Sequence, residues 1–90
     1  MAQWIKADGT IEIVKPANGK QFSLDELQKF VGGYIEMVPY AKYVYCNEEG
    51  RLKGLPQNQI ATLMFNMLLV GDVILCSPQE AGVESGESGE

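Results

Sequence analysis

A short helix is marked at both of its ends by the segment FSLDELQKFVGG, which restricts the fold more than any other part of the chain. Ser23 and Glu26 have the spacing of a capping box, in which each side chain accepts a hydrogen bond from the backbone N–H of the other residue. Phe22 and Leu27 have the spacing of a hydrophobic staple, and Gly32-Gly33 supplies a left-handed stop. The predicted apolar stripe of this helix consists of Leu24, Leu27, Phe30 and Val31.

Apolar, β-branched and aromatic runs on either side of this helix predict strands. In QWIKADGTIEIVK, the pair Asp8-Gly9 favours a two-residue type I′ turn and therefore a hairpin. That turn would pair Trp4 with Ile13 and would place Trp4, Ile11 and Ile13 on one buried face. Further strands are predicted in YIEMVPY, AKYVYC and DVILCS, with a short returning strand in RLKGL.

A second helix is predicted in PQNQIATLMFNMLL, where apolar residues recur at helical spacing. Asn58 is its expected N-cap, although Pro56 could instead occupy the first helical position. Its expected apolar stripe consists of Ile60, Leu63, Met64, Met67 and Leu68. The order of elements predicts an α+β fold, a single small domain over residues 1–77 with a mostly antiparallel sheet and two helices packed on it.

Charge is concentrated at the end of the chain. Residues 78–90, PQEAGVESGESGE, hold four Glu and no cation, and we expect a flexible acidic tail there. Of the net charge of −5, residues 1–77 therefore carry only −1 and lack the basic patch that nucleic acids require. The longest apolar run is too short for a membrane span. Cys46 and Cys76 have no signal peptide before them, so we expect free thiols in the cytoplasm.

The residues also argue against catalysis. The chain has no histidine, which excludes Ser-His-Asp and Cys-His catalysis and most zinc and iron sites. It has no glycine-rich phosphate loop, because the glycines of VGGY follow a helix instead of opening one. Glu48 and Glu49 are neighbours in a predicted turn, where solvated charges are usual. We therefore expect a protein that is not an enzyme and has no catalytic residue, metal or cofactor.

Three tyrosines and one carboxylate are the remaining candidates for recognition. Tyr43 and Tyr45 share a strand face, which Tyr34 could join from the neighbouring strand. This face either packs against the sheet or forms a recognition surface, since tyrosine combines contact area with a polar group. Glu36 lies in a predicted strand, where it either faces solvent or sits in a polar pocket.

The segment NEEGRLKGLPQN allows two interpretations. If it is only a turn and a helix cap, Gly50, Pro56 and Asn58 suffice, with Gly50 suited to a positive φ. If it is a binding loop, its charged residues contact a partner.

The motifs VGGYIEMVPY, YCNEEGRLKGLPQNQIAT and LVGDVIL together resemble a family of small domains of unknown function found mainly in bacteriophages, prophages and mobile elements. The resemblance runs from about Phe22 to Leu75. It implies a small cytoplasmic protein made in an infected or prophage-bearing cell, and it places the residue types of Asn47, Glu48 and Glu49 in the family pattern. Proteins of this size and source often act by binding.

We therefore expect a non-enzymatic binding protein that inhibits a host defence protein, or that binds another host or phage protein. The alternative is a protein that binds or sequesters a nucleotide-like small molecule in a pocket between subunits, lined by Tyr34, Glu36 and Asn58. Two copies could associate as a homodimer through an exposed sheet edge. The expected binding residues are Tyr34, Glu36, Tyr43, Tyr45, Asn47, Glu48, Glu49, Arg51 and Asn58.

Overall fold

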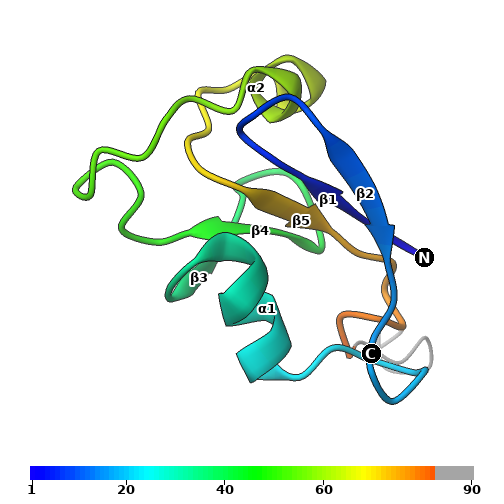
Figure 1. Ribbon diagram of the computed structural model, residues 1–90. Helices are drawn as coiled ribbons and strands as arrows, with labels where there is room; N and C mark the ends of the chain where they lie inside the picture. The colour runs from blue at the N-terminus through cyan, green and yellow to red at the C-terminus, as the bar shows by residue number, and fades with distance from the viewer. Residues whose placement is uncertain (83–90) are drawn as a thin grey trace.

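The computed structural model describes residues 1–82, which form one five-stranded sheet and two helices (Figure 1). The sheet has the order β2-β1-β5-β4-β3, and every neighbouring pair is antiparallel. This confirms the predicted α+β fold. The elements are β1 (Ala2–Ile5), β2 (Ile11–Val14), α1 (Leu24–Val31), β3 (Ile35–Met37), β4 (Val44–Asn47), α2 (Gln59–Phe65) and β5 (Val73–Leu75).

Apolar side chains cover both faces of the sheet, because successive residues of a strand point to opposite sides. On one face, Ile74 packs with Leu27 and Val31 of α1. On the other face, Val73 packs with Ala61 of α2. Ile74 and Val73 are both fully buried, and each contributes about 1.5–3 kcal/mol of transfer free energy. The central strand β5 therefore has a helix packed on each of its faces.

Helix α1 begins and ends as its sequence predicts. The Ser23 hydroxyl accepts a hydrogen bond from the backbone N–H of Glu26 (3.1 Å), and the Glu26 carboxylate accepts one from the N–H of Ser23 (2.8 Å). Hydrogen bonds from the backbone N–H groups of Ser23 and Ala17 lower the pKa of Glu26. Gly32 ends the helix with a φ of 81°. Leu24, expected in the apolar stripe, is the first residue of the helix and is exposed.

The first hairpin differs from the prediction by one residue. The N–H of Lys6 donates to the carbonyl of Thr10 (2.8 Å) and Gly9 has a φ of 95°, which indicates a three-residue loop ending in a left-handed residue. Trp4 therefore pairs with Glu12 instead of Ile13. The Asp8 carboxylate stabilises this loop by accepting hydrogen bonds from the Thr10 backbone N–H (3.0 Å) and hydroxyl (2.6 Å).

A shift of one residue in pairing exchanges the two faces of a strand. Ile11 and Ile13 consequently lie on the face opposite Trp4, and their exposed fractions are 47% and 55%. Trp4 packs against α1, where its ring meets that of Phe30 edge-on at 5.0 Å and its Nε1 donates to the Phe30 carbonyl (3.0 Å). The prediction of one shared buried face is therefore wrong.

Helix α2 is shorter than its apolar spacing predicts. It ends at Asn66, which has a left-handed φ of 56°. The chain then turns back, because the Thr62 hydroxyl accepts a hydrogen bond from the N–H of Leu69 (3.0 Å). Leu63, expected in the buried stripe, is 83% exposed. The strand expected in RLKGL is also absent, since residues 50–54 form turns.

Asn58 is the N-cap of α2, as predicted, and it is fully buried. Its side-chain oxygen accepts a hydrogen bond from the N–H of Ala61 (3.0 Å). Its side-chain nitrogen donates to the carbonyls of Ile5 (2.8 Å) and Gly71 (2.9 Å). One amide therefore joins α2, β1 and the segment before β5.

Two residues of the predicted tail, Glu80 and Ala81, are packed against the domain. Glu80 is buried, and its backbone carbonyl accepts a hydrogen bond from the N–H of Phe22 (2.8 Å). Its carboxylate accepts one from the N–H of Ser77 (3.0 Å). Burial opposes the change, but hydrogen bonds from Ser77 and from the N-terminal ammonium group lower the pKa of Glu80. Ala81 packs against the buried residues on the α1 face of the sheet. This α1-side cluster consists of Ala2, Phe22, Leu27, Val31, Tyr45, Ile74 and Cys76. The predicted tail residues 83–90 lie outside the described part of the chain.

Replacing Asn58 with alanine should lower the free energy of unfolding by about 2–4 kcal/mol, because the change removes a helix cap and leaves buried carbonyls without donors. Urea denaturation followed by Trp4 fluorescence measures this. Asn18→Ala is the matched control, since the Asn18 side chain accepts two backbone hydrogen bonds but is exposed. Equal losses for the two variants would contradict a special role for Asn58.

Candidate functional site

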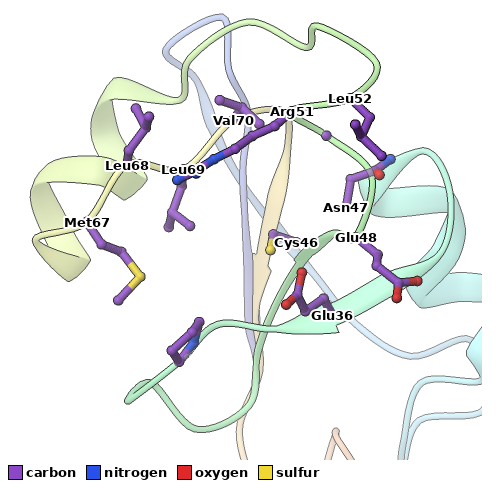
Figure 2. Close-up of a pocket in the computed structure, with 12 residues that line it drawn as sticks. Glu36, Cys46, Asn47, Glu48, Arg51, Leu52, Met67, Leu68, Leu69 and Val70 are labelled. Carbon is purple, nitrogen blue, oxygen red and sulfur yellow. The ribbon is translucent and has the colours of Figure 1, made fainter.

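A cleft of about 320 Å³ opens on the α2 side of the sheet, between the β3–β4 edge and the segment that follows α2 (Figure 2). Glu36 and Cys46, which face each other across β3 and β4, lie at its sheet side. The residues that line it are Glu36, Pro39, Cys46, Asn47, Glu48, Gly50, Arg51, Leu52, Met67, Leu68, Leu69 and Val70.

The apolar wall of the cleft is the segment Met67–Val70, which Figure 2 shows on the opposite side from Glu36 and Glu48. Its position is fixed by two contacts between the residues just before α2 and the residues just after it. The N–H of Asn58 donates to the Leu69 carbonyl (2.8 Å), and Gln57 forms an isolated β-bridge with Val70. The cap of α2 therefore also sets the distance between this wall and the sheet.

The charged side of the cleft is the turn after β4. The buried side chain of Asn47 organises it by donating to the Val31 carbonyl (3.1 Å) and accepting from the N–H of Glu49 (2.7 Å). The N–H of Glu48 donates to the Tyr34 carbonyl (2.8 Å). Within residues 1–82, Arg51 forms no ion pair, so its guanidinium can bind a group from outside the chain.

Gly50 joins the two sides of the cleft. The sequence suggests a positive φ for it, but Gly50 is not among the residues with positive φ. Its requirement is space, because an added Cβ would lie 2.8 Å from Cγ2 of Val70. The turn after β4 and the apolar wall meet at this glycine.

The structure brings together four of the nine residues predicted from the sequence, namely Glu36, Asn47, Glu48 and Arg51. The other five lie elsewhere. Asn58 is buried beneath α2, and Glu49 forms an ion pair with Lys53 (3.6 Å). Tyr34 is exposed outside the cleft lining.

The tyrosines do not form a common surface with the cleft. Tyr45 is buried in the α1-side cluster, and Tyr43 packs against the same cluster. Burial raises the pKa of Tyr45. The sequence allowed two roles for this strand face, packing against the sheet or recognition of a partner, and the contacts of Tyr45 and Tyr43 fit packing.

Pro39, Leu52 and the wall Met67–Val70 are not predicted by the sequence motifs. Leu52 could have been recognised from the sequence, because it is the one large apolar residue in the polar run NEEGRLKG. The wall residues were assigned to a continuous helix, which hid their role. Tyr40, which follows Pro39, is fully exposed and has a φ of 64°. A positive φ is unfavourable for such a residue and is found more often at functional sites.

The comparisons with known proteins identify a family. A family model described as "Domain of unknown function (DUF3846)" matches residues 5–87. The chain belongs to this family. The predicted membership in a family of domains of unknown function is confirmed, whereas the family motifs and an origin in phages or mobile elements stay predictions. No curated protein and no solved structure matches this DUF3846 domain.

Residues 1–82 contain no helix that is long and apolar enough to cross a membrane. The same residues contain no group of three or more His, Cys, Asp or Glu side chains placed to hold a metal ion.

The two cysteines of the DUF3846 domain are free and buried, as predicted. Burial and the nearby charge of Glu36 raise the pKa of Cys46. Burial and the charge of Glu80 raise the pKa of Cys76 to about 12. Neither thiol is therefore a ready nucleophile at neutral pH, because the thiolate is the reactive form.

Both thiols should consequently react with a maleimide at pH 7 at least tenfold more slowly in the folded protein than in 6 M guanidinium chloride. Mass spectrometry of timed samples measures the rate, and the single variants Cys46→Ala and Cys76→Ala assign it. Rapid labelling of Cys46 in the folded state would show instead that the cleft presents a reactive thiol.

Proposed function

We propose that this domain is a non-enzymatic binding protein that holds a segment of a partner protein in the cleft. The observation that supports this most directly is the pair of exposed leucines at the cleft. Leu52 is 89% exposed and Leu68 is 49% exposed, and they belong to opposite walls. Large apolar side chains that gather in an exposed cleft are typical of interaction sites.

The charges of the cleft supply specificity for such a partner. Arg51 can pair with a carboxylate of the partner, and Glu36 and Glu48 can pair with its cations. Apolar contacts at the centre and charges at the rim are the usual arrangement of a protein interface. The partner segment that fits best is therefore apolar with charges of both signs beside it.

The proposed partner is a host defence protein, and the proposed source of the domain is a phage or another mobile element. The support for this step is the resemblance of the GGYIE, NEEG and GLPQN motifs to proteins from such sources. Inhibition by occupation needs no catalytic residue in the inhibitor, which agrees with a chain that has no histidine.

The test is affinity capture from donor or infected cells with the tagged domain, comparing wild type with Leu52→Asp and Arg51→Glu. A charge placed in the centre of an apolar contact costs about 2 kcal/mol or more, so recovery of a stoichiometric partner should fall at least tenfold with Leu52→Asp. Leu63→Asp is the matched control, because Leu63 is equally exposed and lies outside the cleft. A partner that all variants retain would bind elsewhere.

A second candidate is binding of a small anion such as a nucleotide. The specific observation in its favour is Arg51, a cation without an ion pair within residues 1–82, in a cleft whose volume suits a small ligand. The site would lie within one chain and would not include the buried Asn58, in contrast to the pocket expected between subunits.

Thermal denaturation with a panel of mononucleotides and cyclic nucleotides tests this second candidate. A ligand at one hundred times its Kd stabilises the native state by about 2.7 kcal/mol, and a small domain then gains several degrees in Tm. Arg51→Gln should abolish the shift, while Lys42→Gln, at an exposed cation outside the cleft, should retain it. No shift with any nucleotide would remove this candidate.

A further inference from the structure

Strand β2 presents an unpaired edge within the described part of the chain, because it is the outermost strand of the sheet beside β1. Its sequence, Ile-Glu-Ile-Val, contains no proline, glycine or bulge that would block pairing with another strand. Ile11 and Ile13 lie half exposed on its α2-side face. Natural sheets usually protect such an edge, and one that is left open is a template for another strand.

The backbone of β2 shows which groups are free. In an antiparallel pair, the N–H and C=O groups of successive residues point to alternate sides of the strand. The N–H of Lys6 donates to the carbonyl of Thr10 (2.8 Å), so the even-numbered residues of β2 form the hydrogen bonds to β1. The backbone groups of Ile11 and Ile13 consequently point outward.

We propose that the occupant of this edge is a second copy of the chain, paired antiparallel through β2 with Ile13 opposite Ile13 of the other copy. Ile11 of each copy then lies opposite Lys15 of the other, which is one residue past the end of β2, and the central Ile13 pair uses outward-facing backbone groups. On the opposite face, Glu12 lies against Val14. The two Ile13 side chains come together at the symmetry axis on the α2-side face.

Charge disfavours one neighbouring register of β2 and one pairing of the other edge strand. A shift of one residue toward the start of β2 would place Glu12 opposite its own copy, and directly opposed like charges destabilise a sheet. The other edge strand, β3, meets the same difficulty, since symmetric pairing about its centre would oppose two copies of Glu36. Pairing centred on Ile13 avoids opposed carboxylates, and residues 1–77 carry a net charge of only −1.

Sedimentation equilibrium over a range of concentrations tests the dimer, with one chain at 9.9 kDa. Wild type should reach about twice this mass, and Ile13→Lys should raise the dissociation constant at least tenfold by placing two ammonium groups at the axis. Leu24→Lys, the same kind of change at a similarly exposed site on α1, should dimerise as wild type does. Wild type that stays monomeric at all concentrations overturns the proposal.

Crosslinking tests the register without depending on affinity alone. With a short bismaleimide, Ile13→Cys should form covalent dimers rapidly because the two positions are directly opposite. Ile11→Cys should not, because its two positions are separated by about four residues along the strands, roughly 13 Å. Equal crosslinking at both positions, or efficient crosslinking only at position 11, overturns the register. Circular dichroism confirms that each variant remains folded.

Discussion

The buried amide of Asn58 holds together the parts of this domain that its short helices could not hold by themselves. A helix of seven residues is unstable alone, because nucleation is unfavourable and few hydrogen bonds follow it. Asn58 caps this helix, bonds to β1 and bonds to the residue before the turn into β5. Its backbone N–H also donates a hydrogen bond to the Leu69 carbonyl, which joins the segments before and after α2. The position of the cleft wall therefore depends on a side chain that does not line the cleft.

The sequence predicts those elements whose determinants are local. The capping box at Ser23, the stop at Gly32 and the cap at Asn58 need only residues within a few positions of each other, and all three are present. The hairpin register was missed because Asp8-Gly9 is compatible with two loop lengths, and the choice depends on hydrogen bonds from Thr10 to Asp8. A difference of one residue then moves Ile11 and Ile13 from the expected core to the surface.

The candidate site could be predicted only in part, for a related reason. Glu36 lies in β3, Asn47 ends β4, and Glu48 and Arg51 follow in the turn after β4, so the pairing of two neighbouring strands brings them together. The wall from Met67 to Val70 comes from the end of α2, where Asn66 adopts a left-handed conformation that apolar spacing does not reveal. Contact between Gly50 and Val70 is long-range packing, which no single stretch of sequence encodes.

The strand order places the cleft and β2 at opposite ends of the sheet, and this separation has a consequence for valency. Antiparallel pairing through β2 relates the two copies by a two-fold axis perpendicular to the sheet, so both clefts open toward the same side at its two far ends. A target that is itself a symmetric dimer, with matching spacing, could occupy both and benefit from avidity. A monomeric target would bind each cleft independently, so the assembly would distinguish targets by their symmetry as well as by their surface.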